Sequence, residues 1–291
     1  MANTILMAND YMERPGVTVT GAGVASASMA VTNVLTPQPS EFCRFDDESD
    51  AYLVFSGIGS GATATYPPVL SDVDAPVAVF VGFTNCVTSN TIRIRAAVDE
   101  ANLTANPDYD SGEIAFIDDP SKASGYYARE FPRGRHHLTY LPAGTLSEGS
   151  DSTWWRIDII GGSEEDYIDV GVVSIGRPFL ATNPIGNGWS FGGSPSWVGQ
   201  TAMGGQRYRR SVAAPNVLEA TFQMTTEEEA FSMHNLIRNR GEAKPMLAVI
   251  SPGDDTKLMN LSAWGFMSAT QPIAVPYHGL WQTTVRVEEM P

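Results

Sequence analysis

Two short segments of the sequence alternate strictly between apolar and charged side chains, and this feature restricts the fold more than any other. In residues 91–98 (TIRIRAAV) isoleucine alternates with arginine, and in residues 155–159 (WRIDI) isoleucine alternates with arginine and aspartate. Successive side chains of a β-strand point to opposite faces of a sheet, whereas a helix repeats every 3.6 residues. Both segments are therefore predicted to be half-buried antiparallel strands, with the isoleucines in a core.

Further β-rich runs surround these two segments. Between them lie turn clusters such as Gly57–Gly61 and Gly161–Ser163, where glycine supplies the backbone freedom that tight turns need. Short strands at this spacing are typical of an antiparallel sandwich, so residues 31–180 are predicted to form a β-sandwich of the jelly-roll kind. The expected strands are residues 52–55, 77–83, 91–98, 137–140, 155–159 and 168–175.

Residues 207–291 have a different pattern, in which strands surround one helix. The expected strands are residues 217–224, 245–250, 261–266 and 281–287, and the helix is predicted over 226–240. Thr225 with Glu228, or Thr226 with Glu229, has the spacing of a capping box, and Gly241 is the expected stop. The stripe expected to be buried comprises Ala230, Met233 and Ile237, with Leu236 beside them. This part is predicted to be an α+β domain with one helix on a small sheet, so that the chain as a whole is mainly β.

Two segments lie outside these domains. Residues 1–30, rich in Gly, Ala, Ser and Thr, are expected to form an N-terminal arm that orders against other structure, and they are candidates to complete the C-terminal sheet. A terminus without any role is the alternative. Residues 181–206, rich in Gly, Pro and Trp, are expected to be a junction.

The charge balance excludes several classes of function. With 33 acidic and 18 basic residues the formal net charge is −15, which repels a phosphate backbone, so sequence-specific nucleic-acid binding is not expected. No stretch has the length and apolarity needed to span a bilayer, so membrane insertion is not expected.

Cys43 and Cys86 lie in apolar contexts and are predicted to be buried thiols instead of a disulfide.

Several motifs partly match known sites of chemistry, but none of them predicts a catalytic, metal or cofactor site. Residues 188–192 match Gly-x-Ser-x-Gly around Ser190, but a nucleophile elbow needs a helix after the serine, and Pro195 follows too closely. His136 and His137 are adjacent and would point to opposite faces of a strand. Residues 108–113 loosely resemble the start of a calcium loop, for which an Asx turn is the default interpretation.

A basic cluster stands out in this acidic chain. It comprises Arg207, Arg209 and Arg210, and it follows a junction that contains Trp189 and Trp197. Arginine and tryptophan are enriched in protein interfaces, so these five residues are predicted to contact a neighbouring subunit or domain. Solvated surface charge is the alternative interpretation.

The order of features in the C-terminal region resembles that of a known family. The Arg-rich entry at 207–210, the Glu-led helix, the segment Met246–Pro252 and the closing strand 281–287 look like the structural proteins of tailed-bacteriophage tail tips, in particular distal tail proteins. The segment Asn33–Pro39 is similar to one that introduces a galactose-binding-like jelly roll in phage proteins. In many family members the ring domain comes first, whereas here the ring-type unit comes last.

This resemblance implies a non-enzymatic virion protein of the tail tip or baseplate. It would assemble in the host cytoplasm into a homo-oligomeric ring, expected to be a hexamer, between the tail tube protein and the hub proteins of the tail tip. The alternative is a carbohydrate-binding jelly roll that contacts a host-surface glycan, with Tyr126, Tyr127, Arg133 and Arg135 as candidate contacts.

Overall fold

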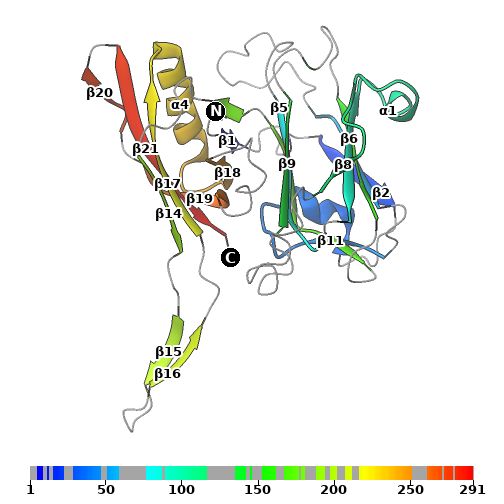
Figure 1. The fold of residues 1–291 in the computed structure, drawn as a ribbon, viewed down its shortest axis with the longest axis horizontal. Coiled ribbons are helices and arrows are strands. Elements are labelled where there is room, and N and C mark those ends of the chain that lie inside the picture. The colour runs from blue at the N-terminus through cyan, green and yellow to red at the C-terminus, as the bar shows by residue number, and fades with distance from the viewer. Residues whose placement is uncertain are drawn as a thin grey trace. The chain divides into compact units, whose positions relative to one another are not determined.

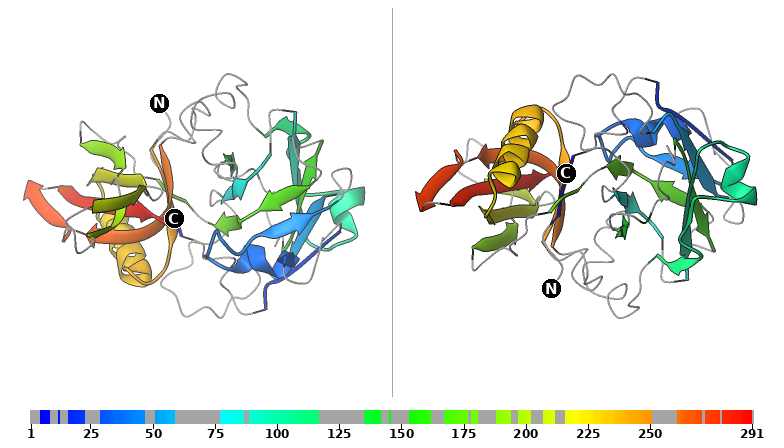
Figure 2. Two further views of the ribbon diagram at one scale, coloured as in Figure 1. Left: turned by 90° about the horizontal axis from the view of Figure 1, so that it is seen from below. Right: turned by 90° about the horizontal axis from the view of Figure 1, so that it is seen from above.

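The protein is mainly β, with several antiparallel sheets. The computed structural model (Figures 1 and 2) describes residues 5–8, 12, 16–22, 29–46, 51–58, 77–86, 89–116, 135–141, 145, 153–161, 167–176, 178–180, 188–193, 197–201, 207–211, 216–250, 261–270, 272–277 and 279–290. These residues form two compact units. The described residues from 12 to 178 make the sandwich unit, and residues 5–8, 179–250 and 261–290 make the helix unit.

The sandwich unit is built from two layers of strands. One sheet has the order β2 (Thr18–Ala22), β4 (Tyr52–Ser56), β10 (Trp154–Ile160), β6 (Thr91–Ala97) and β7 (Tyr109–Asp110), with β8 (Ile114–Ala115) also beside β6. The second layer contains the sheet β12 (Val172–Gly176), β5 (Val77–Thr84) and β9 (Arg135–Leu141), and the pair β11 (Ile168–Val170) and β3 (Cys43–Phe45). A 3-10 turn, η2 (Val31–Leu35), and a one-turn helix, α1 (Asn102–Ala105), complete the described elements of this unit.

The core between these layers confirms the predicted sandwich. Ile157 lies opposite Ile94 across β10 and β6, and both are fully buried. The same apolar cluster includes Trp155 from the first layer and Val79 and Val173 from the second. Removing this much apolar area from water is the main stabilising contribution to such a fold.

One predicted strand of this unit is wrong. Residues 168–175 were expected to form a single strand, but β11 pairs with β3 and β12 pairs with β5, so the chain changes sheets at Gly171. A side chain at this position would lie 2.7 Å from the Cβ of Phe83 and 3.0 Å from the carbonyl oxygen of Pro39. The sequence stays apolar where the chain passes from β11 to β12, because both strands face the core of the sandwich unit.

The helix unit contains one large sheet. Its order is β13 (Pro178–Leu180), β1 (Ile5–Ala8), β18 (Met246–Val249), β19 (Ser262–Thr270), β21 (Leu280–Glu289), β17 (Asn216–Met224) and β14 (Trp189–Gly193), and β20 (Ala274–Tyr277) also pairs with β21. A separate hairpin pairs β15 (Trp197–Thr201) with β16 (Arg207–Ser211). The helix α4 (Glu227–Arg240) lies beside β17 and β21 (Figure 1).

The helix begins and ends where the sequence predicts. The Thr226 side chain accepts a hydrogen bond from the backbone N–H of Glu229, and the Glu229 carboxylate accepts one from the backbone N–H of Thr226, which completes the capping box. Gly241 ends the helix with a positive φ of 51°. Ala230 and Met233 are buried against the sheet, with Leu236 and Ile237 partly buried beside them.

The N-terminal segment joins both units. β1 pairs with β18 of the helix unit, and β2 pairs with β4 of the sandwich unit, so the described strands of residues 1–30 belong to two different sheets. The predicted junction at 181–206 likewise contains two strands, β14 and β15. Propensity alone could not show these strands, because each has only four or five residues and takes its stability from the sheet it joins.

Candidate assembly surface

The sheet of the helix unit has three described strands at its margins, and they differ in how well they are protected from further pairing. β13 has three residues and begins with Pro178, and β20 contains Pro276 and pairs irregularly. Proline lacks an N–H, and short or irregular margins discourage pairing with another chain. β14 contains no proline and pairs regularly with β17 on one side. Of the described margins, β14 is therefore the one suited to accept another strand.

The edge strand β14 also carries exposed apolar side chains. Trp189 is 47% exposed and Phe191 is 37% exposed. They lie opposite Ala220 and Leu218 of β17, both of which are buried in the core of the helix unit. The two aromatic residues therefore extend the core face of the sheet to its open edge. This location agrees with the predicted interface role of Trp189, which stays a prediction.

The hairpin of β15 and β16 lies between β14 and β17 in the sequence, and it contains all three predicted interface arginines. Thr201 lies opposite Arg207, Gly199 opposite Arg209 and Val198 opposite Arg210, and Trp197 begins β15. Figure 1 shows this hairpin extending beyond the ends of β14 and β17. The main contacts of the two strands among the described elements are with each other. A two-stranded hairpin on its own is marginally stable in water, so this one is suited to being covered.

The helix α4 has an exposed apolar side chain on its outer face. Phe231 is 59% exposed, the most exposed of the large apolar side chains in the described part of the chain. Glu227 and Glu228, both exposed, precede it by four and three residues and so lie on the same side of the helix. An exposed phenylalanine with two carboxylates on its N-terminal side forms a small apolar surface that is acidic toward the start of the helix.

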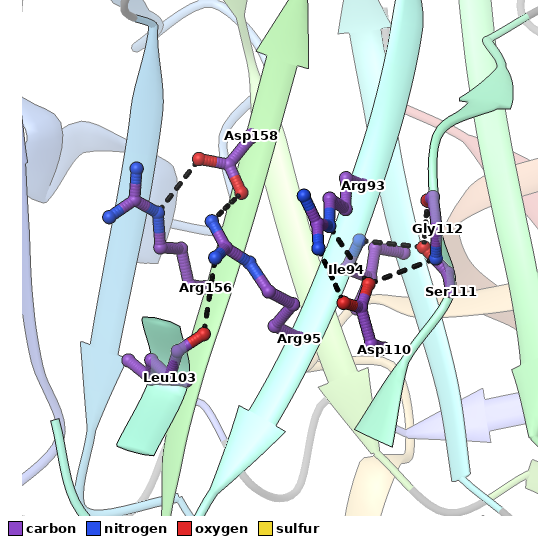
Figure 3. A network of polar contacts seen from close by, with 9 residues as sticks. All are labelled: Arg93, Ile94, Arg95, Leu103, Asp110, Ser111, Gly112, Arg156 and Asp158. Atoms are coloured by element: carbon purple, nitrogen blue, oxygen red, sulfur yellow. Dashed lines mark hydrogen bonds and ion pairs between the residues drawn. The ribbon is translucent and has the colours of Figure 1, made fainter. Parts of the chain in front are cut away.

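The outer face of the sandwich unit carries a network of charged side chains (Figure 3). Asp158 accepts hydrogen bonds from Arg95 Nη2 at 2.6 Å and from Arg156 Nε at 2.7 Å. Arg95 and Arg156 lie directly opposite each other on β6 and β10, so without this carboxylate two like charges would face each other. Arg95 also donates from Nη1 to the carbonyl oxygen of Leu103 on α1. The network fixes two strands and the short helix, and so serves the fold.

A second ion pair of this network bears on the calcium alternative. Asp110 accepts from Arg93 Nε at 2.9 Å and from the backbone N–H of Gly112 at 2.9 Å, and its second oxygen is paired with Arg93 Nη2. The hydrogen bond from Arg93 is the main cause that lowers the pKa of Asp110, and it raises the pKa of Arg93. The bond to Gly112 forms an Asx turn, as the default interpretation predicts. Both carboxylate oxygens are thus used by the protein.

The histidine pair contacts protein groups on two sides of β9. His136 Nδ1 accepts a hydrogen bond from the backbone N–H of Phe83 at 3.2 Å, and His137 lies within hydrogen-bonding distance of the carbonyl oxygen of Phe116 and the hydroxyl of Thr139. Within the described ranges no group of three or more His, Cys, Asp or Glu side chains could hold a metal ion.

The candidate glycan contacts are not brought together in the described part of the chain. Tyr126, Tyr127 and Arg133 lie outside the described residues. Arg135 begins β9, where its backbone pairs with Thr84, and its side chain is outside the description. The glycan-binding alternative therefore stays a prediction.

Ser190 does not lie in a nucleophile elbow. It is an exposed residue in the middle of strand β14, opposite Glu219 of β17. An elbow requires the serine at a sharp turn between a strand and a helix. Asp254 and His278 follow Ser190 in the chain order Ser, Asp, His of the catalytic triad that accompanies such an elbow, but both lie outside the described residues.

Two exposed aromatic residues, Phe191 on β14 and Phe231 on α4, are not predicted as contacts by the sequence. Phe191 follows Trp189 at the period of two that β-strands have, which was the available signal, but the surrounding glycines indicated a linker. Phe231 carried no signal, because an aromatic residue next to a buried helical stripe is usually part of the core.

Among the described helices, none is both long and apolar enough to cross a membrane.

Comparisons with known proteins identify no family. No family model matches the chain, and no curated protein matches it. Among solved structures, the chain is similar to a family 89 glycoside hydrolase from Clostridium perfringens in complex with PUGNAc, with 12% identity and a TM-score of 0.31. The match covers 59% of this chain and 15% of the hydrolase chain. A likeness at this level carries no argument about activity.

Proposed function

We propose that this chain is a non-enzymatic structural subunit that assembles with copies of itself into a closed ring in the tail tip of a bacteriophage. The proposal combines the resemblance to distal tail proteins with one observation from the structure. That observation is the open edge of β14, where Trp189 and Phe191 are exposed on the face that continues into the core.

The physical argument concerns what an open edge does in water. Unpaired N–H and C=O groups along a strand are a template for pairing with another chain, and proteins usually protect such edges. Here the two other described margins contain proline and β14 does not. An edge that is unprotected and flanked by aromatic side chains supports a role in specific pairing with a neighbouring subunit.

In the proposed assembly, the ring lies between the tail tube protein and the hub proteins of the tail tip, and it is a hexamer. The charged network of the sandwich unit favours a structural role for these residues, because its carboxylates are held by arginines of the same chain.

The test is the mass of the purified protein by light scattering at several concentrations, with electron microscopy of any large species. A discrete multiple of the chain mass and ring-shaped particles are expected. A chain that stays monomeric at all concentrations, and that does not bind tail tube or hub proteins, would contradict the proposal.

Edge variants test the observation itself. Trp189→Lys and Phe191→Lys place charges on the open edge and should abolish the large species, because lysine on an edge strand opposes pairing. Val275→Lys is the matched control, since Val275 is 58% exposed on β20, next to Pro276. Equal assembly of the three variants would show that β14 is not the contact.

A further inference from the structure

The hairpin of β15 and β16 has an unusual charge for this chain. None of the 33 acidic residues lies between residues 170 and 218, although the chain as a whole has a formal net charge of −15. Within this stretch the hairpin strand β16 contains Arg207, Arg209 and Arg210. The hairpin is therefore a basic segment attached to an acidic protein.

The outer face of α4 has the opposite character. Phe231 is 59% exposed, and the exposed residues Glu227 and Glu228 lie beside it on the same side of the helix. No other large apolar side chain among the described residues is as exposed as this one. An aromatic side chain beside two carboxylates is complementary in charge to a segment whose sequence contains three arginines.

The two surfaces lie at opposite ends of one strand. The hairpin leads into Asn216 at the start of β17, and the capping residue Thr226 follows shortly after Met224 at its end. Nine residues of strand span about 30 Å at about 3.4 Å per residue. Figure 1 shows the hairpin extending from the end of the strand that is farther from the helix. The hairpin of one copy is therefore directed away from the helix of the same copy.

We infer that the basic hairpin of one subunit docks on the Phe231 face of α4 in the next copy of this chain. Because the two surfaces differ and lie at opposite ends of the unit, the contact is head-to-tail. Head-to-tail contacts give closed rings when the rotation between subunits closes, and filaments when it does not. The inference rests on the proposed function, because it names a contact that acts together with the β14 edge between successive subunits, and both contacts are needed to hold the ring together.

Variants on each side of the contact should weaken assembly in different ways. Phe231→Ala removes the apolar centre and should raise the concentration needed for assembly by about tenfold or more, as loss of a central interface residue does. Replacing Arg207, Arg209 and Arg210 together by Gln should weaken assembly and also remove most of its sensitivity to salt. Val98→Ala, at an apolar residue that is 44% exposed in the sandwich unit, is the matched control and should assemble as the wild-type chain does.

A mixing experiment distinguishes this contact from any symmetric one. One variant carries the triple Arg→Gln hairpin, and the other carries Phe231→Ala with Glu227→Arg and Glu228→Arg. The first variant retains an intact helix face and the second an intact hairpin, so a mixture should form a dimer with one contact and no ring. Each variant alone should be monomeric, and circular dichroism should show that both are folded.

The outcomes separate the inference from the proposed function. Rings of wild-type mass from either variant alone would overturn the hairpin-to-helix contact while leaving a self-assembling subunit in place. A mixture that forms only monomers would also overturn it, because the intact hairpin and intact helix face would then not bind. A wild-type chain that is monomeric at all concentrations would overturn both.

Discussion

The most informative perturbation of the fold is the removal of the Asp158 carboxylate, because two arginines depend on it. Asp158 is held by Arg95 Nη2 at 2.6 Å and by Arg156 Nε at 2.7 Å. The side chains of Arg95 and Asp158 are 9% and 11% exposed, so this pair is largely removed from water. In Asp158→Ala the Arg95 guanidinium stays buried, opposite the like charge of Arg156.

The magnitude follows from that burial. Removing one partner of a buried ion pair typically costs about 3–5 kcal/mol, since the remaining charge is left without compensation. The lower end applies here, because the Arg156 side chain is 24% exposed and water can solvate it. We expect Asp158→Ala to reduce the free energy of unfolding by about 3 kcal/mol, which lowers the Tm of a domain of this size by roughly 6–12 °C.

The assay is urea unfolding followed by tryptophan fluorescence, since Trp154 and Trp155 lie on the same strand as Asp158. Asp110→Ala is the matched control. The side chains of Asp110 and Arg93 are 30% and 36% exposed, and such exposed ion pairs contribute at most about 1 kcal/mol to the free energy of unfolding. A double variant, Arg95→Leu with Asp158→Leu, should recover most of the stability, because Val54, Ala97 and Leu103 provide apolar surroundings. An Asp158→Ala variant that loses no more stability than Asp110→Ala would refute this reasoning.

Three further predictions concern single positions. Thr226→Ala removes the capping box and should lower the free energy of unfolding by about 1 kcal/mol in chemical denaturation. Thr226→Ser keeps a hydroxyl at the cap and should retain nearly all of the wild-type stability. An equal loss of stability in both variants would contradict the capping role. Gly265→Ala should lower the free energy of unfolding by about 3 kcal/mol or more, or prevent folding, because a Cβ there would collide with the carbonyl oxygen of Glu288. A variant with wild-type stability would contradict this packing. Burial, aided by the negative charge of Asp169, raises the pKa of the Cys43 thiol from 9.0 to about 12. The contribution of this thiol to stability is therefore full below pH 9 and lost progressively from about pH 9 to 12, and Cys43 should resist alkylation by iodoacetamide at pH 8 until the chain is unfolded. Rapid native labelling of a Cys86→Ser variant would contradict this prediction.

Local chemistry in the sequence was sufficient for several elements. The alternation at 91–98 and 155–159 predicted two half-buried strands, and they pair with each other with Ile94 opposite Ile157. The spacing of Thr226, Glu229 and Gly241 predicted the bounds of the helix, because capping depends on residues that are neighbours along the chain. The same kind of argument predicted two buried free thiols, which the structure confirms.

Tertiary structure decided what depends on contacts between distant segments. The sequence by itself could not divide residues 168–175 between two sheets, because the apolar pattern is the same on both sides of Gly171 when both halves face one core. It could not place β1 beside β18, since a strand of four residues is defined by its partner. Nor could it distinguish a Gly-rich linker from the edge strand β14, where Trp189 and Phe191 become an exposed surface only because nothing described lies on their open side. Pattern along the chain determines which residues are able to be strands and helices, and pairing across the chain determines which edges and faces remain for a partner.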